Sequence, residues 1–395
     1  MAEITTISAI VDRMKKMTKR LFEENAYIKE FTATVIDCQP AEHGFLVVLN
    51  ETAFFPEGGG QAADGGTLNG VAVTDVQMKE DVIYHTTATP LTIGEQVVGV
   101  IDWQTRFARM QSHTAEHLVS GIVYREFGFS NMGFHMSDTT MTADFAGVLT
   151  AEDIAKVETL ANTAVYENVA ITVEVLSGDS LKAKEYRSKL DLDTDVRLVT
   201  ITGYDCCACC APHVNRTGEI GAIKILGFYP NKGGTRVEMT AGVNALQDYR
   251  FLHDQNKSLM GLLSAKRERV GETVAHLAET LKNTQNELRL LQQKLALASM
   301  ETVEAGEILC AFVPNAAYDG LQSCVNTLSA PIRLVFSQTD DGWLYVAASE
   351  AGDVRPIIQK LNTAFGGRGG GKPNYGQGKL AVCDKADMVA LLQNN

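Results

Sequence analysis

The segment Gln-Ser-His-Thr-Ala-Glu-His-Leu, residues 111–118, carries two histidines four positions apart. Apolar residues at Met110, Leu118 and Val119 favour a helix here, and a helix brings side chains at i and i+4 to the same face. Both imidazoles can therefore reach one metal ion. A zinc-protease motif is unlike this one, because the residue after the first histidine is Thr114 instead of glutamate. A histidine pair without a ligand is the alternative.

A second motif further along the chain strengthens the metal prediction. Residues 209–213 read Cys-Cys-Ala-Pro-His, which again places a thiol and an imidazole four positions apart. Three of the eight histidines in the chain belong to these two motifs. Thiolate and imidazole donors suit zinc, so the sequence predicts a zinc site with four ligands. These are His113, His117, Cys209 and His213.

The composition is that of an ordinary globular protein, with 45% hydrophobic and 21% charged residues in a chain of 395. No apolar run is long enough to span a bilayer and no signal pattern is present, so we expect a cytoplasmic protein. Four of the eight cysteines lie within residues 206–210, which favours metal binding or redox chemistry over a disulfide framework. The net charge of −13 argues against non-specific coating of nucleic acid.

The pattern of apolar residues predicts an α+β fold in four parts. Short alternating segments in residues 1–100 are typical of a small β-barrel or sandwich. Residues 101–249 read as mixed α+β, with the histidine pair on a helix and the cysteine cluster on a loop after a strand. The same pattern predicts a long helix over residues 250–302. It predicts a compact α/β module over residues 303–395.

Two finer patterns lie in the last two parts. A 3,4 spacing of mainly apolar residues runs from Met260 to Leu295, which predicts a coiled coil that either pairs with a second chain or packs within the monomer. Residues 365–379 contain seven glycines, and we expect a loop whose amides and cations suit a phosphate backbone. A loop without a ligand is the alternative.

Several motifs together resemble the alanyl-tRNA editing proteins, the free-standing relatives of the editing half of alanyl-tRNA synthetase, in the long form with a C-terminal DHHA1 domain. They occur in the family's order and cover most of the chain from about residue 20 onward. The matching pieces are Phe-Phe-Pro-Glu-Gly-Gly-Gly-Gln at 54–61, His-Thr-Ala-Glu-His at 113–117, Cys209 with His213 and Val214, residues 217–221, residues 236–242, and the glycine-rich residues 366–378.

The resemblance implies a zinc-dependent deacylase that hydrolyses Ser-tRNA(Ala), with Gly-tRNA(Ala) as a second candidate substrate, in the cytoplasm. It also implies a homodimer formed through the coiled coil and the DHHA1 region. It implies that residues 101–249 form the editing domain and that the four zinc ligands are the catalytic centre. Thr52 is the expected partner of the seryl hydroxyl. The other expected substrate contacts are Gly58, Gly59, Gly60, Gln61, His135 and Arg236, and the expected tRNA contacts are Lys232, Arg368, Lys372 and Lys379.

The chain departs from the family in its thiol motif. The family usually has Cys-Gly-Gly-Thr-His where this chain has Cys-Cys-Ala-Pro-His, and extra thiols at Cys206, Cys207 and Cys210 leave the sulfur ligand open. Cys209 is favoured because it keeps the four-residue offset from His213. A non-catalytic tRNA-binding protein with a structural zinc is one alternative. A nucleic-acid phosphoesterase is another, but the chain lacks an Asp-His-His signature.

Overall fold

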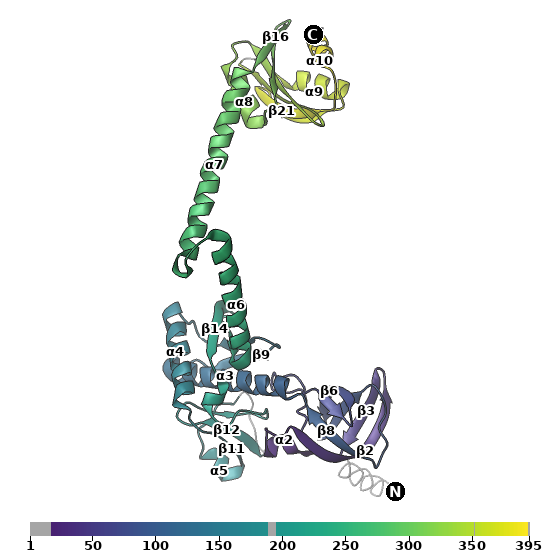
Figure 1. The fold of residues 1–395 in the computed structure, drawn as a ribbon, viewed down its shortest axis with the longest axis vertical. Helices are drawn as coiled ribbons and strands as arrows, with labels where there is room; N and C mark the ends of the chain where they lie inside the picture. Colours follow the sequence, from purple (N-terminus) through teal and green to yellow (C-terminus); the bar gives the residue numbers. More distant parts are fainter. Residues whose placement is uncertain (1–16, 189–194, 351, 394–395) are drawn as a thin grey trace. The chain divides into compact units, whose positions relative to one another are not determined.

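The computed structural model describes residues 17–188, 195–350 and 352–393, and the chain divides into two compact units, Met1–Gln255 and Asn256–Asn395. The predicted mixed α+β character is confirmed (Figure 1). Among the described residues, no helix is both long and apolar enough to cross a membrane. Short elements include β1 (Lys19–Arg20), α2 (Leu21–Glu24), β4 (Glu51–Thr52), α5 (Gly178–Lys182) and the 3₁₀ turns Thr217–Ile220 and Arg267–Arg269.

The first unit begins with a closed antiparallel barrel in the strand order β2-β3-β7-β6-β5-β8. Inward-facing apolar side chains alternate with exposed ones, as the burial of every second residue in the last strand illustrates. Phe54 and Phe55, which follow the strand β4, are buried in the same core. The barrel strands are β2 (Glu30–Ala41), β3 (Gly44–Leu49), β5 (Gly66–Leu68), β6 (Val71–Lys79), β7 (Val82–Thr87) and β8 (Gln96–Ile101).

The rest of the first unit contains two sheets and two long helices. A four-stranded sheet in the order β14-β15-β10-β9 shares one apolar core with both helices, and a three-stranded sheet has the order β11-β12-β13. The helices are α3 (Trp103–Phe127) and α4 (Ala151–Glu167). The strands are β9 (Asn131–Met136), β10 (Met141–Phe145), β11 (Ile171–Leu176), β12 (Val196–Ile201), β13 (Asp205–Ala208), β14 (Ile223–Asn231) and β15 (Gly234–Ala241).

Helix α3 carries the histidine pair and begins where the barrel ends. Asp102 caps its N-terminus by accepting a hydrogen bond from the Thr105 amide, and Gly128 ends it in a left-handed conformation. Near its start, the fully buried Arg106 forms an ion pair with Asp64 of the barrel segment. This contact fixes the helix against the barrel, so the two parts form one compact unit.

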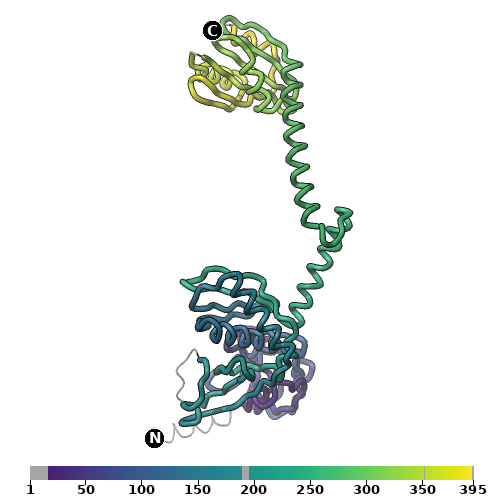
Figure 2. The backbone as a smooth tube through the Cα atoms, turned by 90° about the vertical axis from the view of Figure 1, so that its left-hand side faces the viewer, coloured from purple at the N-terminus to yellow at the C-terminus, as the bar shows by residue number. Residues whose placement is uncertain are grey.

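The long helix expected over residues 250–302 is wrong as a single element. The structure has α6 (Gly242–Leu263) and α7 (Val270–Ala298), and the interruption between them is visible in both ribbon and tube (Figures 1 and 2). Ser264 has a positive φ of 48°, a conformation that ends a helix. The 3,4 spacing resumes at Val270, and the one pattern position inside the interruption is the polar Arg267, which the prediction of a single helix counted as an exception.

The second unit is built on a six-stranded sheet in the order β16-β17-β18-β19-β21-β20. One apolar core lies between the sheet and helices α9 and α10, and another lies between the sheet and α8. The bounds are β16 (Glu301–Ala305), β17 (Ile308–Pro314), α8 (Tyr318–Thr327), β18 (Ile332–Thr339), β19 (Gly342–Ser349), α9 (Arg355–Ala364), β20 (Arg368–Lys372), β21 (Tyr375–Leu380) and α10 (Lys385–Gln393).

The glycine-rich loop expected at residues 365–379 is also corrected. Most of it is an antiparallel hairpin, in which β20 pairs with β21 and forms an edge of the sheet. Glycine has a low strand propensity, so the sequence favours a loop. The pairing requires glycine nonetheless, because a Cβ at Gly369 or Gly371 would lie within 2.3 Å of an atom of the neighbouring strands.

Candidate metal centre

Side chains from two distant segments meet as the sequence predicts. His113 and His117 project from α3, and Cys209 and His213 come from the segment after β13. One donor atom from each of the four lies within 4.8 Å of the others. The Cys209 Sγ atom is 3.7 Å from His113 Nε2 and 3.4 Å from His213 Nε2. The three histidines are almost fully buried.

These separations fit a tetrahedral zinc ion. With Zn–S near 2.3 Å and Zn–N near 2.05 Å, a tetrahedral angle puts sulfur and nitrogen about 3.6 Å apart. The two observed distances from Cys209 Sγ lie on either side of that value. The donor set of one thiolate and three imidazoles is also one that zinc prefers. The four residues therefore fit the ion in both chemistry and spacing.

Hydrogen bonds at the far side of two of the rings orient them. His113 Nδ1 lies 2.9 Å from Gln61 Oε1, an acceptor. His213 Nδ1 lies 3.0 Å from the Thr114 hydroxyl, which donates its own proton to the Met110 carbonyl and so accepts from the ring. Each ring thus carries its proton on Nδ1 and presents the lone pair of Nε2 to the cluster.

The electrostatics of the cluster favour a thiolate. Burial opposes ionisation of the Cys209 thiol, but the three surrounding imidazoles outweigh burial and hold its pKa well below the usual value. Burial also opposes charging of His117, yet the Cys209 sulfur and the Asp205 carboxylate raise its pKa well above the usual value. Burial lowers the pKa of His213 to about 3, so this ring is neutral at physiological pH.

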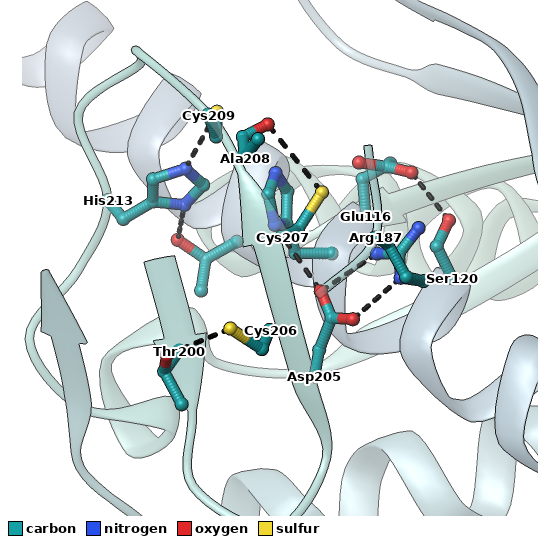
Figure 3. Close-up of polar contacts among 12 residues, drawn as sticks. Glu116, Ser120, Arg187, Thr200, Asp205, Cys206, Cys207, Ala208, Cys209 and His213 are labelled. Carbon is teal, nitrogen blue, oxygen red and sulfur yellow. Dashed lines mark hydrogen bonds and ion pairs between the residues drawn. The ribbon is translucent and has the colours of Figure 1, made fainter. Parts of the chain in front are cut away.

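The extra cysteines separate into different surroundings. Cys206 and Cys207 lie on β13, which corrects the expectation that the whole cysteine cluster is on a loop. Cys206 accepts a hydrogen bond from Thr200 (Figure 3). Burial raises the pKa of both Cys207 and Cys210. Cys209 is the cysteine that groups with all three histidines, whereas the sulfur of Cys207 groups with His117 and Asp205.

The triple-glycine segment forms a tight turn beside the cluster. Gly58 and Gln61 exchange two backbone hydrogen bonds of 3.0 Å. Gly59 and Gly60 have φ values of 59° and 82°, and a Cβ at Gly60 would lie 2.8 Å from the Phe134 ring. Glycine is therefore required where the backbone approaches the histidines. Gln61 itself contacts His113, and its amide nitrogen is buried without a partner among the described residues.

A cavity of about 1420 Å³ opens beside the cluster. His113, His117, Cys209, Gly59 and Gly60 contribute to its lining. Arginines also line it, namely Arg20, Arg125, Arg187 and Arg197. Carboxylates line it as well, including Glu23, Glu185, Asp195 and Asp205, so the wall carries charges of both signs beside the cluster of donor atoms.

Glu116 is a cavity-lining carboxylate that sequence reasoning did not assign. Its Oε1 atom accepts hydrogen bonds from Ser120, at 2.5 Å, and from Asn131, and the Ser120 contact is visible in Figure 3. The side chain is 5% exposed although it lies between the two histidines in sequence. The available sequence signal was a glutamate placed between the two histidines of the motif.

The structure separates the remaining predicted substrate contacts from the cavity. Thr52 is fully buried inside the barrel, where its hydroxyl lies 2.8 Å from His85 Nε2. Thr52, His135 and Arg236 do not appear among the residues that line the cavity in the described part of the chain. His135 is exposed on β9, and Arg236 on β15 forms an ion pair with Asp144.

The predicted tRNA contacts are surface cations. Lys232 occupies the turn between β14 and β15 with a positive φ of 46°. Arg368 and Lys372 are exposed on the edge strand β20. Lys379 on the adjacent strand β21 lies 3.4 Å from Asp341. The three C-terminal cations therefore belong to one hairpin.

Comparisons with known proteins identify the family of this chain. The chain is 30% identical to the alanyl-tRNA editing protein Aarsd1 of Rattus norvegicus over 402 aligned positions, which cover 95% of this chain and 97% of the relative. The Mus musculus protein of the same name matches with the same identity and coverage. The chain belongs to the family of alanyl-tRNA editing proteins. The family resemblance of the sequence motifs is thereby confirmed.

Family models and a larger relative extend the comparison. Residues 196–238 match the model described as the threonyl and alanyl tRNA synthetase second additional domain, and residues 6–105 match the model for class II (A) tRNA synthetases. An alanine–tRNA ligase of Ignicoccus hospitalis is 30% identical over 95% of this chain and 42% of the ligase. The first of these matched segments contains Cys209 and His213, so the family match and the cluster coincide.

Proposed function

We propose that this member of the alanyl-tRNA editing family hydrolyses the ester bond of Ser-tRNA(Ala), with Gly-tRNA(Ala) as a second substrate, and spares Ala-tRNA(Ala). The observation that carries the proposal is the convergence of His113, His117, Cys209 and His213, the first three of which line a cavity. The names of the relatives, which are editing proteins and a ligase for alanyl-tRNA, support the substrate class. The reaction adds water across the ester and releases serine and the tRNA hydroxyl.

The four clustered residues would hold zinc, which polarises an ester carbonyl or lowers the pKa of a bound water. The protein supplies a buried thiolate and three buried imidazoles, and hydrogen bonds orient the rings of His113 and His213. Four protein ligands complete a tetrahedral shell, so a catalytic role requires five-coordination or a weakened ligand. A complete shell of four protein ligands is also typical of a structural zinc. This supports the alternative of a non-catalytic tRNA-binding protein.

Glu116 suits the α-ammonium group of the aminoacyl moiety. Its carboxylate is held by Ser120 and Asn131 and lines the same cavity as the two histidines of α3. The other charged groups described at that wall are arginines and the carboxylates of Glu23, Glu185, Asp195 and Asp205, and Glu116 is the lining carboxylate that lies on α3 with the two histidines. We therefore propose that Glu116 anchors the amino acid while the arginines face the tRNA end.

Thr52 remains our candidate for selecting serine over alanine. His85 Nδ1 donates to the Val47 carbonyl at 3.0 Å, so its Nε2 accepts the Thr52 hydroxyl proton. Burial lowers the pKa of His85 to about 4, which keeps this ring neutral. The Thr52 oxygen also accepts from the Phe54 amide, and it retains one lone pair with which it could receive a seryl hydroxyl. A site that hydrogen-bonds an added hydroxyl rejects the substrate that lacks it.

The second unit supplies the proposed tRNA and partner contacts. Arg368, Lys372 and Lys379 on one hairpin, with Lys232 in the first unit, would contact phosphates. Leucines of α7 that follow the 3,4 spacing are more than half exposed, which supports pairing with a second copy of the chain. These are Leu277, Leu281, Leu288, Leu291 and Leu295.

The test is release of labelled amino acid from a panel of Ser-, Gly- and Ala-tRNA(Ala), with the protein as purified, stripped of metal by a chelator, and reloaded with zinc. We expect serine release that is lost on stripping and restored by zinc, with Ala-tRNA(Ala) intact. Tight tRNA binding without release of any amino acid would favour the non-catalytic alternative.

A further inference from the structure

One of the three clustered histidines differs from the others in its outer contact. Gln61 and Thr114 are neutral acceptors for His113 and His213. His117 instead faces a carboxylate, because its Nδ1 atom lies 3.5 Å from Asp205 Oδ2. This nitrogen is buried and has no hydrogen-bond partner among the described residues, and the Asp205 carboxylate is the ion-pair contact that it has. Asp205 is therefore the available acceptor for the His117 Nδ1 proton.

The carboxylate is fixed in place from behind. Arg187 donates to both of its oxygens, from Nε to Oδ1 at 2.6 Å and from Nη2 to Oδ2 at 2.8 Å, and Figure 3 shows both contacts. The Arg187 backbone is itself held to β13, since its amide donates to the Cys206 carbonyl and its carbonyl accepts from the Ala208 amide. The Asp205 side chain is only 2% exposed.

The packing of α3 against β13 makes this approach possible. Gly121 lies one helical turn after His117 on the same face of α3. A Cβ at Gly121 would lie 2.6 Å from the Asp205 Cβ and 2.6 Å from the Tyr204 carbonyl oxygen. The absence of a side chain at Gly121 thus lets the helix approach the strand closely enough for His117 and Asp205 to meet.

We propose that Asp205, clamped by Arg187, is a positioning residue that holds His117 with its proton on Nδ1 and its Nε2 lone pair directed at the metal. Carboxylates behind metal-bound histidines fix the tautomer and ring orientation and strengthen the ligand. This inference rests on the proposed metal site. It goes beyond the four ligands because it assigns a role to the buried ion pair between Asp205 on β13 and Arg187.

The same atoms could be read as a second metal site, because His117, Asp205 and Cys207 also form a compact donor group. The Arg187 contacts argue against that reading. Both oxygens of the carboxylate are engaged by a guanidinium, whose positive charge would repel a second cation. The neutral pair of Asp205 and Arg187 instead offers His117 an acceptor without adding net charge to the buried site.

The experiment measures zinc affinity by competition with a chromophoric chelator, and the d–d absorption spectrum of the cobalt(II)-substituted protein, without tRNA. Asp205→Ala should weaken zinc binding by about 10–100-fold and alter the cobalt spectrum. Asp205→Asn, which keeps an acceptor oxygen, should lie between Asp205→Ala and the wild type. The matched control is Asp144→Asn, because Arg236 holds Asp144 with the same two distances of 2.6 and 2.8 Å on strands away from the cluster.

Unchanged zinc affinity and cobalt spectrum in Asp205→Ala would overturn the proposal, and so would equal losses in Asp205→Ala and Asp144→Asn. Uptake of two zinc ions by the wild-type protein would replace it with the second metal site. If Asp205→Ala does not fold, Asp205→Asn and Arg187→Gln carry the same test. A wild-type protein that binds zinc with the expected dependence on Asp205 but releases no serine would refute the proposed function alone.

Discussion

Helices α3 and α7 are of similar length and treat their side chains in opposite ways. In α3 the continuous run from Met110 to Val123 is buried, although it contains two histidines, a glutamate, a glutamine, a threonine and two serines. In α7, every residue of which is described, Ala296 is the one buried side chain, although leucines recur along one face. One helix hides polar groups and the other exposes apolar ones.

Both departures from the usual distribution of residues carry information about function. Buried polar side chains are costly unless they are hydrogen-bonded or bind a ligand, so their concentration on α3 marks the site of chemistry. An exposed apolar stripe leaves no buried polar group without a partner, and it forms a surface that another protein can bind. Substitutions on each helix, and on the hairpin of the second unit, can test whether α3 carries the chemistry and α7 binds a partner.

The largest effect that leaves the metal in place is expected from Glu116→Gln. The substitution keeps the size of the side chain and its contacts with Ser120 and Asn131, but removes the charge that we assign to the substrate ammonium group. We expect kcat/KM for Ser-tRNA(Ala) to fall by about 10–100-fold, the range expected for losing a charged hydrogen bond, with zinc content unchanged. An unchanged kcat/KM would remove Glu116 from the site.

A smaller effect is expected from Thr52→Val. Loss of the hydroxyl should lower seryl release by about tenfold, as expected for one hydrogen bond of roughly 1.4 kcal/mol, without loss of zinc. The measurement is seryl release at matched zinc content, with the melting temperature recorded in parallel. A normal rate together with a lower melting temperature would assign Thr52 to barrel stability, through its contact with His85.

The hairpin of the second unit should affect binding more than chemistry. The double variant Arg368→Ala with Lys372→Ala should weaken tRNA binding several-fold and reduce the slope of log K against log salt by about 1–2. Lys385→Ala is the control, because this lysine in the same unit forms an ion pair with Glu301. Identical salt slopes for the double variant and the wild type would contradict the proposed phosphate contacts.

The smallest effect on catalysis is expected on α7. Leu281→Lys with Leu288→Lys places charge on the exposed apolar face and should convert a dimer to a monomer in light scattering, with little change in seryl release per chain. A wild-type protein that is already monomeric at micromolar concentration would show that α7 does not pair in this way.

The sequence predicted α3 and the four-residue donor set because both depend on local spacing, which a helix or a short turn converts directly into geometry. It also predicted short alternating strands within residues 1–100, where the strands of the barrel are found. It missed the interruption between α6 and α7 near Ser264, because the 3,4 spacing is apolar on both sides and only Arg267 departs from it. It missed the hairpin of β20 and β21 because glycine-rich strands are stabilised by tertiary pairing, not by propensity.

The outer contacts of the site were beyond the reach of the sequence for a related reason. Asp205 and Arg187 meet His117 only because β13 and the segment before it fold back against α3, which no spacing along the chain encodes. Thr52 shows the same limit, since the sequence motif suggests a substrate contact but does not reveal the buried contact of its hydroxyl with His85.

The most direct test of the central claim pairs metal analysis with seryl release in the same preparations of wild type, Cys209→Ala and His117→Ala. We expect about one zinc ion per wild-type chain, and we expect each variant to lose both zinc and serine release. Zinc-free Cys209→Ala protein that still deacylates Ser-tRNA(Ala) at the wild-type rate would contradict this claim.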